Sequence, residues 1–103
     1  MEYNPSGPDL EGEYVLIENR GAGSQDMTGW TLWDKKSQSH AYRFPDNFIL
    51  PAAGASASVR VWTKSDTDTA TDLYWGLDSP VWGNSDTARL LDDTWNEVDS
   101  LEW

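Results

Sequence analysis

The chain has 103 residues, the size of one domain with a single hydrophobic core, and its 18 acidic and 7 basic residues give a formal net charge of −11. This charge weighs against nucleic acid as a ligand, because phosphate binding requires clustered lysine or arginine. Cysteine is absent, which excludes disulfides and thiolate metal sites.

Short runs of alternating apolar and polar residues, separated by clusters of Gly, Pro, Asn and Asp, dominate the chain. The runs are rich in β-branched and aromatic residues, and their spacing of roughly 10–20 residues predicts a small all-β sandwich. In chain order, the predicted strands cover 13–19, 29–34, 41–44, 57–63, 72–76, 86–92 and 96–103. Residues 20–29 and 34–40 are predicted turns, and 50–55 is a predicted tight corner. No stretch of ten residues has the apolar spacing of an amphipathic helix, so we expect one β domain over residues 1–103.

Alternation along the strands also assigns side chains to faces. Six residues are expected to face the core: Val15, Ile17, Trp30, Leu32, Val59 and Val61. The period of two then places Tyr14, Leu16, Trp33 and Trp62 on the outer side, together with Arg60. Tyrosine, tryptophan and arginine are enriched at interface hot spots, so the candidate partner-binding residues are Tyr14, Trp33, Arg60 and Trp62.

With Trp33, Trp62 and Leu16 expected on neighbouring strands, these side chains would form an outward apolar patch, which either binds a partner or is covered. We expect the long connection 64–86 to cover it, since Leu73, Trp75 and Trp82 punctuate an otherwise polar segment. Two alternatives stay open: an exposed protein-binding or dimer surface, and a platform on which sugar rings stack.

The same connection contains the spacing Asp66-x-Asp68-x-x-x-Asp72, which begins like a calcium-binding EF-hand loop. The pattern then fails, because Thr71 replaces the invariant glycine and no glutamate occupies the twelfth position. We therefore predict no metal site and a solvated connection, with weak Ca²⁺ binding by these aspartates as the open alternative.

Catalytic residues are not expected either. The only histidine, His40, lies in a predicted polar turn, and the many acidic residues show no distinguishing spacing. The sequence therefore predicts no enzyme, no catalytic residue and no cofactor.

The composition of the charged residues indicates the kind of solvent to which the protein is adapted. Twelve Asp, six Glu and only three Lys are typical of salt-adapted, haloarchaeal proteins, in which salt screens the repulsion between carboxylates. The alternative is an acidic surface that serves solubility alone. We expect no signal peptide or membrane span in this chain. The compartment stays open: extracellular if the domain comes from a secreted protein, otherwise cytoplasmic.

Four segments, in order along the chain, resemble the lamin tail domain, the immunoglobulin-like domain of nuclear lamins that also occurs in bacteria and archaea. They are "YNPSGPDLEGEYVLIENRG" (3–21), "MTGWTLWD" (27–34), "FPDNFILPAAGASASVRV" (44–61) and "VWGNSDTARLLDDTWNEVDS" (81–100). Thr94 and Trp95 stand where the family usually has a turn Asp-Gly, so we expect a longer and less regular final loop.

The resemblance implies an immunoglobulin-like β-sandwich of about seven to nine mostly antiparallel strands, without enzymatic activity. It implies a binding or scaffolding module with a protein partner, appended to a secreted or nucleic-acid-processing protein in many prokaryotes. The chromatin contacts of nuclear lamins are not expected here, because the chain lacks a basic surface. We expect a monomer or weak homodimer that binds no membrane, and a carbohydrate-binding β-sandwich is the alternative function.

Overall fold

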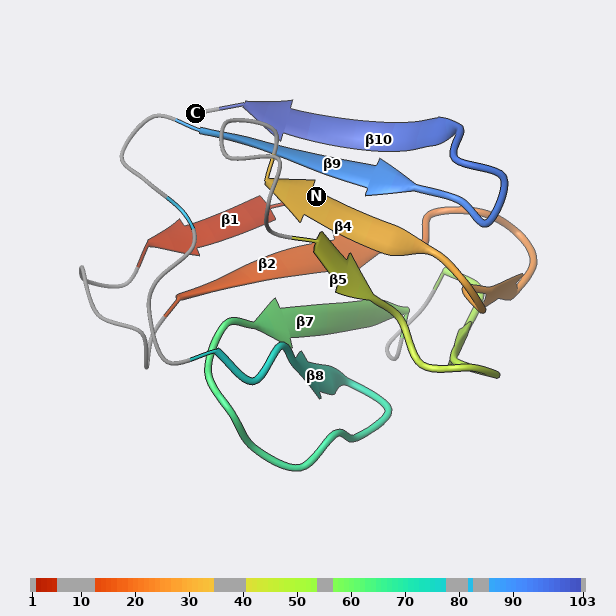
Figure 1. The fold of residues 1–103 in the computed structure, drawn as a ribbon. Coiled ribbons are helices and arrows are strands. Elements are labelled where there is room, and N and C mark those ends of the chain that lie inside the picture. The colour runs from red at the N-terminus through yellow and green to blue at the C-terminus, as the bar shows by residue number, and fades with distance from the viewer. Residues whose placement is uncertain are drawn as a thin grey trace. The chain divides into compact units, whose positions relative to one another are not determined.

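The computed structural model describes residues 2–5, 13–34, 41–53, 57–77, 82 and 86–102. Within these ranges the chain forms ten strands and no helix. Figure 1 shows the course of the chain and labels the longer strands. None of the described residues belongs to a helix that is long and apolar enough to cross a membrane. Residues 35–40 of one predicted turn, with His40, and Gly54 and Ala55 of the predicted corner lie outside the described residues.

The chain folds into two compact units, each built from two stretches of sequence. Unit 1 comprises residues 1–25 and 50–80, and unit 2 comprises residues 26–49 and 81–103. A short two-stranded sheet, β3 (Gln25–Asp26) and β6 (Ile49–Leu50), forms where the chain leaves one unit and enters the other. That residues 1–103 act as one domain stays a prediction.

Unit 1 contains a four-stranded sheet in the order β1-β2-β7-β8. Its strands are β1 (Glu2–Pro5), β2 (Glu13–Glu18), β7 (Ser58–Trp62) and β8 (Asp72–Tyr74). All neighbours are antiparallel except β7 and β8, which run parallel. Side chains on one face of the sheet are buried: Val15, Ile17, Val59, Val61 and Leu73. Because fully burying such a side chain contributes about 1.5–3 kcal/mol, this face fixes the register of the pairings β2–β7 and β7–β8.

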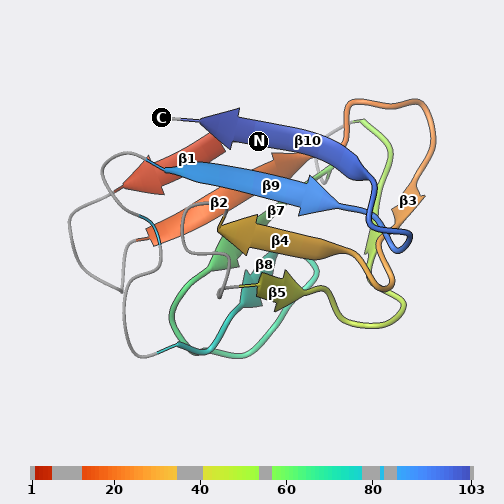
Figure 2. The same cartoon turned by 45° about the horizontal axis from the view of Figure 1, so that its top comes forward.

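Unit 2 contains a second four-stranded sheet, in the order β10-β9-β4-β5, whose neighbours are all antiparallel (Figure 2). Its strands are β4 (Thr31–Asp34), β5 (Ala41–Arg43), β9 (Thr87–Leu91) and β10 (Glu97–Glu102). Leu32 pairs with Leu90 on one side and Tyr42 on the other, and all three side chains are buried. The predicted core residues in the strands of both sheets are thus buried, but in the second sheet Thr31 and Leu91, which alternate with them, are buried as well.

The second predicted strand begins later than expected. Trp30 is buried, as predicted, but it precedes β4 instead of lying within a strand. Its N–H donates to the carbonyl of Met27 at 3.1 Å and its carbonyl accepts from the N–H of Phe44 at 2.9 Å. The Gly29 before it has a φ of 79°, so the preceding turn reverses the chain just before the strand.

The final loop is longer than a two-residue hairpin turn, as predicted. It runs from Asp92 to Asn96 between β9 and β10, and the ladder shifts register between Glu97 and Asp99. Trp95 adopts a φ of 67°, the conformation that glycine would accept without strain.

Candidate interaction face on the sheet of unit 1

Three of the four predicted partner-binding residues lie together on one face of the unit 1 sheet. Tyr14 of β2 pairs directly with Trp62 of β7, and Arg60 lies two residues before Trp62 on the same face. Trp33, in contrast, belongs to β4 of the other sheet. The prediction that Trp33 and Trp62 lie on neighbouring strands is therefore wrong, because strand order is set by long-range pairing that alternation does not encode.

An aromatic row crosses this sheet. Trp62 pairs with Tyr14 on one side and with Tyr74 of β8 on the other. The ring centroids of Tyr14 and Trp62 are 4.6 Å apart at a tilt of 52°, and those of Trp62 and Tyr74 are 6.3 Å apart and nearly parallel at 12°. All three side chains are half-buried, so each presents part of its ring to solvent.

Two cations lie over the row. The guanidinium carbon of Arg60 is 5.4 Å from the ring centroid of Tyr14, and Nζ of Lys64 is 4.8 Å from that of Trp62. Each such contact contributes about 0.5–1 kcal/mol at an exposed position. Tyr14, Arg60, Trp62, Lys64 and Tyr74 are called the aromatic face below.

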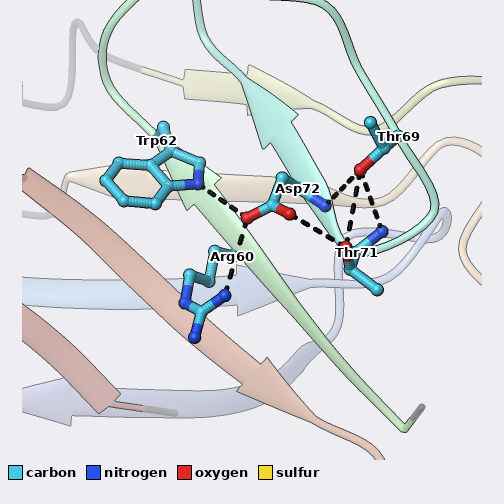
Figure 3. A network of polar contacts seen from close by, with 5 residues as sticks. All are labelled: Arg60, Trp62, Thr69, Thr71 and Asp72. Carbon is cyan, nitrogen blue, oxygen red and sulfur yellow. Dashed lines mark hydrogen bonds and ion pairs between the residues drawn. The ribbon is translucent and has the colours of Figure 1, made fainter.

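Asp72 organises the edge of this face, as Figure 3 shows. Its Oδ1 accepts a hydrogen bond from Nε1 of Trp62 at 2.9 Å and lies 3.7 Å from the guanidinium of Arg60. Its Oδ2 accepts from the hydroxyl of Thr71 at 2.8 Å. Burial acts to raise the pKa of Asp72, but the hydrogen bonds from Trp62 and Thr71 and the charge of Arg60 together outweigh it and lower the pKa.

The turn that leads into β8 holds Asp72 in place. The hydroxyl of Thr69 accepts from the backbone N–H groups of Thr71 and Asp72 at 3.3 and 3.1 Å, and the N–H of Thr69 donates to the carbonyl of Asp72 at 2.8 Å. Desolvation of the phenol raises the pKa of Tyr74, and the negative charges of Asp72, Asp66 and Asp68 raise it further. The phenol of Tyr74 therefore stays protonated across the neutral range.

The three aspartates with EF-hand spacing do not converge on a point. Oδ1 of Asp66 accepts from the N–H of Thr67 at 2.7 Å, and Oδ1 of Asp68 accepts from the N–H of Tyr74 at 2.9 Å. In the part of the chain that the structure describes, no three His, Asp or Glu side chains are grouped so that they could hold a metal ion. These carboxylates act as backbone and side-chain acceptors that shape the loop.

The prediction that Leu73 of the connection 64–86 covers the outward face is wrong. Instead of lying over the outward face, residues 72–74 extend the sheet as the parallel strand β8, and Leu73 is buried on the opposite face with Val61 as its partner. The same pairing brings Asp72 and Tyr74 onto the aromatic face. Sequence reasoning missed both residues, although the short alternating run 72–76 was a predicted strand and its period of two was the available signal.

The model of the Lamin Tail Domain family matches residues 1–103. The chain belongs to the lamin tail domain family. The all-β, immunoglobulin-like fold class is confirmed, and lamin tail domains are in general non-catalytic modules that mediate interactions. In this lamin tail domain, the aromatic face contains the three predicted site residues that the structure brings together, Tyr14, Arg60 and Trp62.

Proposed function

We propose that this lamin tail domain is a non-catalytic module that binds a protein partner through the aromatic face. One observation carries the proposal: three aromatic rings in direct ladder register, flanked by two cations, form a half-exposed surface. Tyrosine, tryptophan and arginine contribute most of the binding energy in typical protein interfaces. The bonds of Asp72 to Trp62 and Thr71 fix the surface before binding, which lowers the entropic cost of association.

The alternative of a carbohydrate platform has less support. Sugar rings stack on flat, coplanar aromatic surfaces, but Tyr14 is tilted by 52° from Trp62. Only Trp62 and Tyr74 are nearly parallel, at 12°. A titration of the protein with oligosaccharides is expected to leave its tryptophan fluorescence unchanged, whereas saturable quenching would favour carbohydrate binding.

The partner is expected to be supplied by a larger assembly or a longer chain. We propose that the module acts as an appended or scaffolding domain, as a monomer or weak homodimer, and that nucleic acid is not its ligand, because the net charge is −11. The low lysine and high aspartate content supports a salt-adapted source.

The test is site-directed cross-linking followed by affinity measurement. A photo-reactive phenylalanine analogue at position 74 is expected to capture a partner in cells, whereas the same group at the exposed Ile49 is expected not to. With the captured partner purified, Trp62→Ala should weaken binding by roughly tenfold or more, as loss of a hot-spot residue does. The matched control Ile49→Ala should leave the affinity unchanged. Equal capture at positions 74 and 49, or unchanged affinity in Trp62→Ala, would overturn the proposal.

A further inference from the structure

Two rows of side chains cross the outward side of the unit 1 sheet at right angles to its strands. The first row consists of Tyr14, Trp62 and Tyr74, and the second of Leu16, Arg60 and Asp72. Neighbouring strands are spaced about 4.8 Å apart, so the two end members of a row are about 10 Å apart. A ligand that contacts all three rings of the first row therefore runs across the strands and not along them.

The loop that precedes β8 occupies the outer edge of this strand, where the described sheet of unit 1 ends. The N–H of Tyr74 donates to Oδ1 of Asp68 at 2.9 Å, and the carbonyl of Asp72 accepts from the N–H of Thr69 at 2.8 Å. The N–H of Asp72 donates to the hydroxyl of Thr69 at 3.1 Å. The edge thus lacks the row of available groups that an added strand needs. A partner segment has to dock on the side chains of the face.

The polar groups that the aromatic face offers to a ligand are mainly hydrogen-bond donors. The side chain of Arg60 is 47% exposed, and a guanidinium carries five N–H groups. Within the described residues, the phenol hydroxyls of Tyr14 and Tyr74 form no hydrogen bond, and each can donate one. The carboxylate of Asp72, in contrast, already accepts from groups of the face itself (Figure 3). The face therefore complements a ligand that is rich in partly negative acceptors and poor in donors.

A polypeptide in the polyproline II conformation has this chemistry. Proline lacks the backbone N–H but keeps its carbonyl, and the helix has no internal hydrogen bonds, so its carbonyls remain available as acceptors. With three residues per turn and a rise of about 3.1 Å, prolines at positions i and i+3 lie on one side about 9 Å apart. This spacing matches the distance of about 10 Å between Tyr14 and Tyr74. Such a helix forms before binding, so docking costs it little conformational entropy.

We propose that the aromatic face binds a proline-rich segment of a protein partner, with two prolines three residues apart packed on the rings of Tyr14 and Tyr74. The segment crosses the sheet over Trp62, and its carbonyls accept hydrogen bonds from Arg60 and the phenol hydroxyls. This inference rests on the proposed function and names the class of sequence that the partner presents. A sugar fits this face less well, because its hydroxyl groups require acceptors as well as donors.

The probe is a blocked synthetic peptide of four Pro-Ala-Thr repeats, which has a proline at every third position. The control peptide has the same composition, but its four prolines stand at alternate positions, so no two are three residues apart. NMR titrations with the repeat peptide should show saturable shifts of the indole N–H of Trp62 and of the amides of β7 and β8. The control peptide should bind roughly tenfold more weakly, because it loses one of two ring contacts. Equal binding of the two peptides, or shifts confined to other surfaces, would overturn the proposal.

The decisive variant is Tyr74→Leu, which removes the ring and the hydroxyl at one end of the row but keeps an apolar side chain. Its affinity for the repeat peptide should fall by roughly tenfold. If this variant fails to fold, Arg60→Gln takes its place, and the loss of the guanidinium should likewise weaken binding by several-fold or more. Ile49→Ala, which truncates an exposed side chain outside the face, is the matched control and should bind normally. Unchanged affinity in the folded variant would overturn the proposal.

The partner captured through the photo-reactive group at position 74 separates this inference from the proposed function. We expect the cross-link to map to a segment with prolines three residues apart, and an excess of the repeat peptide to prevent the capture. A captured partner without such a segment, or capture that the peptide leaves unchanged, would overturn this inference and leave the proposed function standing. Equal capture at positions 74 and 49 would overturn both.

Discussion

The indole N–H of Trp62 donates a hydrogen bond of 2.9 Å to the carboxylate of Asp72, which joins the side chains of two parallel neighbouring strands. The bond fixes the ring of Trp62 between Tyr14 and Tyr74, and the same carboxylate oxygen lies within ion-pair distance of Arg60. One acid therefore orients both the central ring and one of the two cations of the aromatic face.

The stabilising effect of Asp72 should depend on pH. Because its pKa is lowered in the folded state, its contribution is present above the unfolded pKa of about 3.9 and is lost as the pH falls through the folded value. Asp72→Asn should cost about 1.5 kcal/mol of unfolding free energy near neutral pH, the lower end of the range for a hydrogen bond to a charged group, because the amide oxygen can still accept from Trp62. Denaturant unfolding of the wild type and the variant should show this gap narrowing below about pH 4.

The control for net charge is Asp93→Asn, which neutralises an exposed carboxylate of the final loop. This variant should be close to the wild type in stability at neutral pH. A gap between wild type and Asp72→Asn that stays constant down to the lowest pH would show that the ionised carboxylate is not the stabilising group.

Truncation of Trp30 should be severe. The side chain is only 9% exposed, and replacing a buried aromatic by alanine costs about 3–5 kcal/mol. Trp30→Ala should therefore lower the thermal midpoint strongly and unfold much of the protein at ambient temperature, as followed by circular dichroism. Ile49→Ala, at an exposed position, should melt like the wild type; if Trp30→Ala did so too, the burial of Trp30 would contribute little to stability.

The turn before β4 should require glycine at one position. Gly29 has a φ of 79°, and a Cβ there would lie 3.2 Å from Cβ of Asp93, so Gly29→Ala should cost about 1–2 kcal/mol. Gly23 is the matched control, because a Cβ there would meet nothing within 4 Å. Gly23→Ala should be neutral or slightly stabilising in the same denaturant titration. Equal effects of the two substitutions would contradict the argument from backbone conformation.

Stability should increase with salt. The 18 acidic residues repel one another with only 7 basic residues to offset them, and added ions screen that repulsion. The melting temperature should therefore rise between about 0.1 and about 2 M KCl. Potassium sulfate at matched ionic strength separates screening from general salting-out effects, and a flat or falling curve in KCl would speak against a salt-adapted surface.

Local alternation was enough to predict which side of its own strand each side chain occupies. Val15, Ile17, Val59 and Val61 are buried while Tyr14, Arg60 and Trp62 share the opposite face, because successive Cβ atoms in a strand point to opposite sides. The missing glycine at the final turn likewise predicted a longer loop, since a two-residue hairpin requires residues that accept positive φ.

Which strands lie beside one another was decided only by the tertiary structure. Strand β8 pairs in parallel with β7 and so adds Tyr74 and Asp72 to the face, whereas Trp33 lies in the other sheet against Trp95, 62 residues later in the chain. Both arrangements rest on pairings between segments far apart in sequence. Their free energy comes from the combined burial of many side chains, so no single strand's pattern of residues contains it.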